Sequence, residues 1–263
     1  MTFRQSVDTG SPPCDSRAQN RDSFTRILCS FVLFGIAFGY VEAAVVVYLR
    51  SLYEPLLEQA HISRASGELF PLIRIEQLEQ AGPQATGLLS TELVREFATL
   101  VMLAAVGLVC ARNMRQWFAG FMISFGVWDI SYYVFLKVLA DWPESLLTWD
   151  LLFLLPVPWA GPVIAPVLVA AAMITAGTII LHRDLNGRPV DLRWTHWIAI
   201  LLGGTIIIVA FCWDFRNLLA GGNPNRFNWP LFVSGMMVGI VSFIWALNRT
   251  VPQTSSQLVS DGP

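Results

Sequence analysis

The stretch GVWDISYYVFLKVLADWPESLLTWD, residues 126–150, decides how the chain is organised. Asp129 lies inside an apolar run in its first part, a short polar corner occupies residues 141–144, and apolar sequence resumes around Asp150. Ionisable side chains inside apolar runs of membrane length are costly, so they usually have a role in packing or function. Partners for these two carboxylates are expected to come from other apolar runs of the chain.

The composition predicts a polytopic membrane protein. Of the 263 residues, 54% are hydrophobic and 14% are charged, and the mean hydropathy is +0.55. Soluble domains carry roughly 25% charged residues, so the lipid bilayer is the expected partner. The net charge of −2 and the absence of a Lys/Arg-rich arm exclude a nucleic-acid partner. The four cysteines show no CxxC spacing, which predicts packing residues rather than a disulfide or metal site.

The predicted fold is an all-α bundle of six transmembrane helices, because six apolar runs are long enough to span a bilayer. The polar residues 1–26 and 248–263 are predicted to be disordered cytoplasmic tails. Residues 50–91 form the longest connection, predicted to be an outer loop that folds as a small cap. The predicted spans lie near residues 27–49, 92–111, 117–139, 162–181, 194–213 and 230–247.

Four prolines, at positions 156, 158, 162 and 166, interrupt the apolar stretch before the fourth span. Proline removes a backbone donor and breaks helices. We therefore expect a short helix near residues 144–155, either re-entrant or interfacial, followed by a break at PVPWAGP. The first span contains a GxxxG motif, Gly35 and Gly39, which indicates close helix packing and possible helix–helix self-association.

The distribution of basic residues predicts the orientation. Ten arginines lie on the side that holds both termini, and seven basic residues lie on the other side, several of them around the long loop. Short loops carry most of the positive-inside signal. Both termini are therefore expected in the cytoplasm, with the chain in a bacterial inner membrane.

This orientation gathers charged side chains from spans 1, 2 and 3 and from the proline-rich segment in the outer half of the bilayer. Glu92 and Glu96 also fit a helix start, where acidic side chains interact favourably with the helix dipole. We predict that Asp129 contacts Arg95 or Glu96 across the interface of spans 2 and 3. The candidate ligand-binding residues are Glu42, Arg95, Glu96, Asp129, Lys137 and Asp150.

The motifs of zincins, α/β-hydrolases, dinucleotide-binding folds and P-loops are absent, so the sequence assigns no metal ligand, cofactor or reaction. A carboxylate cluster suits a hard cation, proton transfer, or a small polar ligand such as an outer-leaflet lipid headgroup. The first hypothesis is a ligand or headgroup site. The alternatives are a proton- or cation-coupled transporter using the same carboxylates, and a non-catalytic subunit or scaffold whose buried ion pairs only fix the packing.

Overall fold

The computed structural model describes residues 14–59, 83–219 and 226–248. In this part of the chain, six helices are long and apolar enough to cross a membrane, judged by length and composition, and the six predicted spans fall on them. They are α1 (Cys14–Gln59), α3 (Pro83–Cys110), α4 (Met114–Ala140), α5 (Ile164–Leu185), α6 (Trp194–Phe211) and α8 (Trp229–Asn248).

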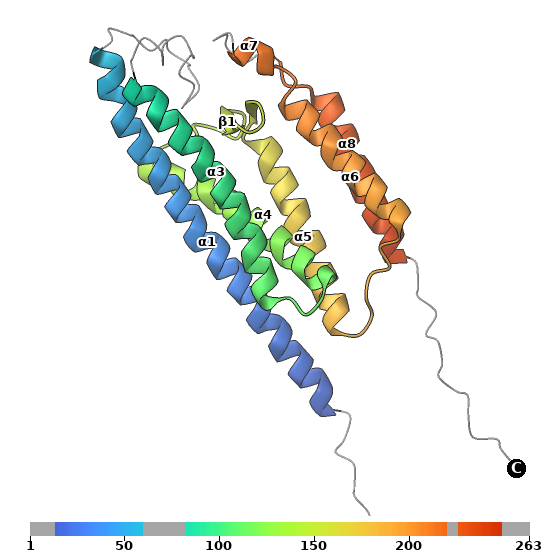
Figure 1. The fold of residues 1–263 in the computed structure, drawn as a ribbon. Coiled ribbons are helices and arrows are strands. Elements are labelled where there is room, and N and C mark those ends of the chain that lie inside the picture. The colour runs from blue at the N-terminus through green and yellow to red at the C-terminus, as the bar shows by residue number, and fades with distance from the viewer. Residues whose placement is uncertain (1–13, 60–82, 220–225, 249–263) are drawn as a thin grey trace, which may run out of the picture.

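A small β-hairpin lies at one end of the helical bundle, which we call the hairpin end (Figure 1). It consists of β1 (Trp149–Phe153) and β2 (Trp159–Pro162), and the short helix α7 (Phe215–Leu219) lies at the same end. The start of α1 and the end of α8 both lie at the opposite end, as an even number of spans requires.

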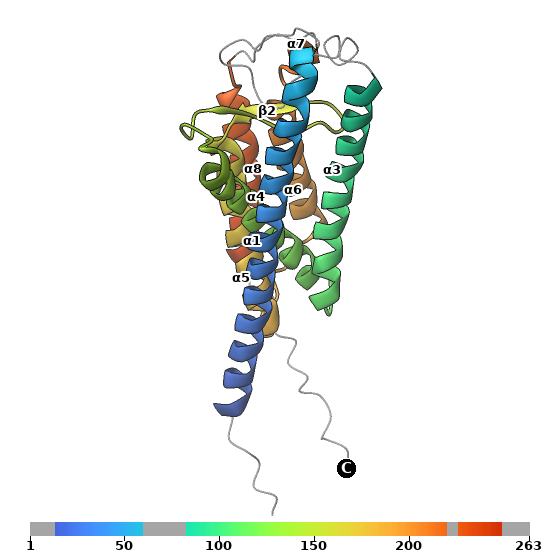
Figure 2. The same ribbon diagram turned by 90° about the vertical axis from the view of Figure 1, so that its left-hand side faces the viewer.

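Helix α4 is the centre of one group of helices, because it packs extensively against α1 and α5 and also against α3. Helices α6 and α8 form a second closely packed pair (Figure 2 shows them behind α1). A hydrophobic cluster around Phe31, Ile123, Ile180 and Leu181 fills the bundle toward the end opposite the hairpin. The acidic residue that α4 buries, Asp129, lies closer to the hairpin.

The GxxxG motif brings α1 against α4 within the chain. A Cβ atom added at Gly39 would lie 2.7 Å from the Cβ of Ser131 and 2.9 Å from the carbonyl oxygen of Trp128. A Cβ added at Gly35 would meet the side chain of Val127 at 2.8 Å. The motif thus serves intramolecular packing, and the face predicted for self-association is covered by α4.

The end opposite the hairpin is held together by the carboxylate of Asp184 on α5. It accepts hydrogen bonds from Asn113 Nδ2, Arg115 Nε and Gln116 Nε2 at 2.9, 2.9 and 2.8 Å. Asn113 also caps α4 by accepting from the backbone N–H of Gln116. The turn between α3 and α4 is thereby fixed to the end of α5.

The prediction of a short helix over residues 144–155 is wrong, because this segment contains a turn and the first strand of the hairpin. The strands pair antiparallel, with Asp150 opposite Gly161 and Leu151 opposite Ala160. No proline lies within residues 144–155, and the backbone of the second part of this segment pairs with the strand Trp159–Pro162 instead of forming hydrogen bonds within a helix. The backbone N–H groups of Val163 and Ile164 donate to residues 148 and 146, which fixes the hairpin to the start of α5.

The helix bounds also differ from the predicted tails and loop. Helix α1 begins at Cys14, so residues 14–26 form its first turns rather than a disordered tail. It continues to Gln59, and α3 already begins at Pro83, so both helices extend into the predicted outer loop. Residues 1–13, 60–82 and 249–263 lie outside the described residues, and with them most of the predicted cap and the C-terminal tail.

Candidate functional site

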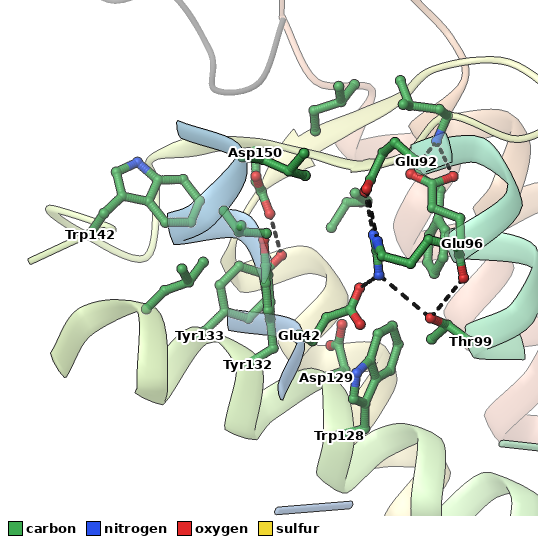
Figure 3. A pocket seen from close by; sticks show the side chains of 18 residues that line it. Glu42, Glu92, Glu96, Thr99, Trp128, Asp129, Tyr132, Tyr133, Trp142 and Asp150 are labelled. Atoms are coloured by element: carbon green, nitrogen blue, oxygen red, sulfur yellow. Dashed lines mark hydrogen bonds and ion pairs between the residues drawn. The ribbon is translucent and has the colours of Figure 1, made fainter. Parts of the chain in front are cut away.

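A cavity of about 70 Å³ lies at the hairpin end, enclosed by α1, α3, α4 and β1 (Figure 3). This volume holds several water molecules or one small polar group. Within the described part of the chain, it is lined by five carboxyl groups and one guanidinium, together with tyrosine, tryptophan and aliphatic side chains. The carboxyl groups belong to Glu42, Glu92, Glu96, Asp129 and Asp150.

Helical periodicity explains why these side chains meet. On each of the three helices, the lining residues recur at intervals of three and four, which places them on a single face. Strand β1 closes the cavity with consecutive residues from Asp150 onward. The helical contributions are Glu42, Val46 and Leu49 from α1, then Glu92, Arg95, Glu96 and Thr99 from α3, and Trp128, Asp129, Tyr132, Tyr133 and Leu136 from α4.

Arg95 connects α1 to α3 across the cavity wall. Its Nη1 donates to Glu42 on α1, and its Nε and Nη2 bind the two carboxylate oxygens of Glu92 one turn away on α3, with Nε 2.8 Å from Oε2. Two parallel bonds to one carboxylate are the strongest geometry for this kind of pair. Because α1 and α3 contact each other far less than either contacts α4, this ion pair is a principal link between them.

Glu96 holds the hairpin. Both oxygens of its carboxylate accept the backbone N–H of Leu154, at 3.2 and 3.0 Å, directly after the last residue of β1. This N–H lies where the strand ends and therefore has no partner in the opposite strand. A backbone donor shielded from water is costly without a hydrogen-bond partner, so the acidic side chain has a structural role at this position.

Asp150 lies in β1 and is 2% exposed. Its Oδ2 accepts the hydroxyl of Tyr133 on α4 at 2.9 Å. Burial raises the pKa of the Asp150 carboxyl to about 6, although the hydrogen bonds from Tyr133 and from the backbone of Leu151 oppose this rise. The carboxylate can therefore change its charge near neutral pH.

Two buried polar atoms in the cavity have no hydrogen-bond partner among the described residues. They are Oδ2 of Asp129, an acceptor, and Nε1 of Trp128, a donor. The two residues are 8% and 5% exposed. An unsatisfied buried group costs about 1–3 kcal/mol. Figure 3 shows both side chains extending from α4 into the cavity, on the side of Glu42 and Thr99.

The structure brings five of the six predicted site residues to this cavity, namely Glu42, Arg95, Glu96, Asp129 and Asp150. Lys137 does not line it. Its ammonium is paired with Oδ1 of Asp141 at 2.6 Å at the exposed end of α4, because the eight-residue spacing from Asp129 carries it beyond the cavity toward the corner.

The predicted contact of Asp129 with Arg95 or Glu96 is wrong. Arg95 is bound by Glu42 and Glu92, and Glu96 is occupied by the hairpin. Glu92 is not among the predicted site residues, and its i,i+3 spacing from Arg95 is the signal in the sequence for the ion pair. The sequence gives no sign that Trp128, Tyr132 and Tyr133 line a cavity, because the strand β1 that closes it is not predicted.

The carboxylates are distributed around the wall of the cavity. Among the residues that the structure describes, no three histidine, cysteine, aspartate or glutamate side chains converge as a candidate metal cluster. Comparison with protein-family models, curated proteins and solved structures finds no match to this chain. Its function must therefore be inferred from the residues of the cavity.

Proposed function

We propose that this chain is a multi-pass membrane protein that binds a small organic cation, an alkylammonium group, in the cavity at the hairpin end. This end faces the outer side of the membrane when the termini are cytoplasmic, as the basic residues predict. The observation that carries the proposal is an excess of carboxylates over cations in a partly open cavity, with Oδ2 of Asp129 buried and without a hydrogen-bond partner among the described residues.

The charges in the cavity are not balanced by the protein. Arg95 can neutralise only one of the carboxylates that it contacts, Glu42 and Glu92. Asp129 and Asp150 line the cavity without a cationic partner of their own in the described residues. Buried charges require a counter-charge or a proton. A ligand with one positive charge neutralises one of these carboxylates, and those that remain require a proton.

The aromatic side chains favour an ammonium group. Trp128, Tyr132, Tyr133 and Trp142 line the same cavity as the carboxylates. Aromatic faces attract cations through their quadrupole, and the attraction is largest where water is excluded. A wall of carboxylates and aromatic rings thus interacts favourably both with the charge and with the carbon atoms of an alkylammonium ion.

Binding is favoured over transport by what lies beyond the cavity. The hydrophobic cluster that includes Phe31 and Ile123 fills the space next to α4 on the side away from the hairpin. A transporter needs alternating polar access from both faces. A second cavity of about 430 Å³ lies at the opposite end, where Arg115 and Asp191 line it among mostly apolar residues. The hydrophobic cluster lies between the two cavities, so a transport cycle requires the bundle to rearrange.

The proposal is tested by titrating ethylammonium chloride into the purified protein in detergent micelles, with sodium chloride as the blank, by isothermal titration calorimetry. Asp129→Asn keeps the shape of the side chain and removes its charge. It is expected to weaken binding at least tenfold, as expected when one partner of a buried charge pair is removed. Asp141→Asn is the matched control, because Asp141 is exposed outside the cavity.

The outcomes are distinct. Heat of binding in the parent and in Asp141→Asn, with loss in Asp129→Asn, supports the proposal. Absence of binding in the parent, or equal binding in both variants, rejects it. Binding of magnesium chloride in place of ethylammonium indicates a metal site, and flux of labelled ethylammonium into proteoliposomes indicates the transporter instead. If the parent binds neither ethylammonium nor magnesium, the result supports the hypothesis of a non-catalytic subunit or scaffold.

A further inference from the structure

The two unpartnered atoms in the cavity restrict the ligand further than its charge does. An acceptor, Oδ2 of Asp129, and a donor, Nε1 of Trp128, come from consecutive residues of α4 and line the same cavity. A bare alkylammonium ion donates hydrogen bonds but accepts none. It satisfies Asp129 and leaves the indole N–H of Trp128 without an acceptor.

We infer that the ligand is a 2-amino alcohol unit, in which an ammonium group and an oxygen atom are carried on neighbouring carbons. This inference rests on the proposed function. The ammonium donates to Asp129, and the oxygen accepts the N–H of Trp128.

The other carboxylates of the cavity already have hydrogen-bond partners, and for this reason we assign the ligand to Asp129 and Trp128. Glu42 and Glu92 bind Arg95, Glu96 binds the backbone of Leu154, and Asp150 binds the hydroxyl of Tyr133. Among the described residues, Asp129 is thus the cavity carboxylate with a fully buried oxygen that accepts no hydrogen bond. The cavity of about 70 Å³ has room for a two-carbon amino alcohol unit.

The same chemistry comes from two sources. In free ethanolamine the oxygen is a hydroxyl, and in the headgroup of phosphatidylethanolamine it is the ester oxygen next to the phosphate. Both oxygens accept a hydrogen bond, so Trp128 does not distinguish between them. The location of the cavity at the hairpin end, between helices that face lipid, is compatible with either source.

The test compares ethanolamine, ethylamine and 1,2-ethanediol by calorimetry on the full-length protein in nanodiscs of phosphatidylglycerol. The parent is expected to bind ethanolamine about three- to tenfold more tightly than ethylamine, the worth of one neutral hydrogen bond, and to bind the diol least. Trp128→Phe keeps an aromatic ring and removes the N–H. It is expected to abolish the preference for ethanolamine while ethylamine binding is retained.

Trp159→Phe is the matched control, because the Nε1 of Trp159 is also buried without a hydrogen-bond partner in the described part of the chain, and Trp159 does not line the cavity. Equal affinity of the parent for ethanolamine and ethylamine overturns the amino-alcohol inference and leaves the ammonium site standing; a trapped water then satisfies Trp128. If neither amine binds, the proposed function fails as well. The comparison in the parent decides the question even if Trp128→Phe does not fold.

The source of the amino alcohol is decided by repeating the titration in nanodiscs that contain phosphatidylethanolamine. Loss of ethanolamine binding in these discs, and its recovery in phosphatidylglycerol discs, identifies the lipid headgroup as the occupant. Binding that is unchanged by the lipid identifies the free amino alcohol. In both cases Trp128→Phe must reduce the selectivity, and selectivity that is unaffected by this variant excludes the indole as the hydrogen-bond donor.

Discussion

The carboxylate of Glu96 accepts the backbone N–H of Leu154 through both oxygens, and it thereby joins α3 to the end of β1. A residue that first appears to be part of an acidic ligand site thus completes the hydrogen bonds of the hairpin. The hairpin in turn supplies Asp150 to the cavity. Structural and ligand-binding carboxylates are therefore different residues of one cluster, and they are separable by mutation.

Glu96→Ala is expected to lower the stability by about 1–3 kcal/mol, since the N–H of Leu154 loses its partner. Glu96→Gln is expected to cost less, because the amide oxygen still accepts this bond. Thermal unfolding followed by intrinsic fluorescence compares the two variants with the parent. Equal unfolding midpoints for Glu96→Ala and Glu96→Gln would show that the hydrogen bond to Leu154 contributes nothing to stability.

Arg95→Met is expected to destabilise the protein by about 3 kcal/mol, because Glu42 and Glu92 lose their shared counter-charge. The value is at the lower end for breaking a buried pair, since the Arg95 side chain keeps 24% exposure. Replacing both partner acids by leucine in the same chain is expected to restore the midpoint to near that of the parent, as apolar substitutes for buried ion pairs often do.

Comparing the triple variant with Arg95→Met separates the repulsion between Glu42 and Glu92 from the loss of packing by the Arg95 side chain. If the triple variant unfolds as early as Arg95→Met, the guanidinium stabilises the α1–α3 contact by more than charge neutralisation. Thermal unfolding in the same detergent is sufficient for this comparison.

The close approach of α1 to α4 is tested at Gly39. Gly39→Ala is expected to destabilise the protein by about 1–3 kcal/mol, the usual cost of overpacking, because the new methyl group would lie 2.9 Å from a backbone oxygen that cannot move independently. Gly204→Ala on α6 is the control, since an added Cβ there meets nothing within 4 Å. That variant is expected to unfold at or above the midpoint of the parent.

The sequence predicts the helical bundle well because apolar length is a local property of each run. It also predicts that Glu42, Arg95, Glu96, Asp129 and Asp150 gather, because they lie at similar depth in their spans. It does not predict pairing, since Arg95 has several acids within reach and only the packing of α1 selects Glu42. The hairpin escaped prediction because its hydrogen bonds join residues across a proline-rich turn, which helical periodicity does not register.

The orientation is tested by cysteine labelling in whole cells with a membrane-impermeant maleimide. Asn186 is exposed at the end of α5, opposite the hairpin, and Glu144 is exposed in the corner after α4. With cytoplasmic termini, Glu144→Cys is expected to react from outside, and Asn186→Cys only after the cells are permeabilised. The parent, with its own cysteines, sets the background. External labelling at position 186 reverses the proposed topology and moves the cavity to the cytoplasmic side.

The last prediction concerns pH and Asp150. Burial raises the pKa of this carboxyl from 3.8 to about 6, so it is neutral well below pH 6 and ionised above. Only the ionised form attracts an ammonium ion, and alkylammonium ions stay charged throughout this range, as lysine does with a pKa of about 10.4. Ethylammonium affinity is therefore expected to rise as the pH increases through about 6, and to fall up to tenfold for each unit below it.

Several groups surround Asp150 and bear on this titration. Tyr133 and Asp129 face it from α4, and the charged residues of α1 and α3 lie across the cavity, namely Glu42, Glu92, Arg95 and Glu96. Asp150→Asn isolates its contribution, since the amide keeps an oxygen that accepts the hydroxyl of Tyr133. Calorimetric titrations are made from about pH 5 to about pH 8, on both sides of the pKa of about 6. The ethylammonium affinity of this variant is expected to change less with pH than that of the parent. A profile as steep as that of the parent assigns the pH dependence to a different carboxylate of the cavity.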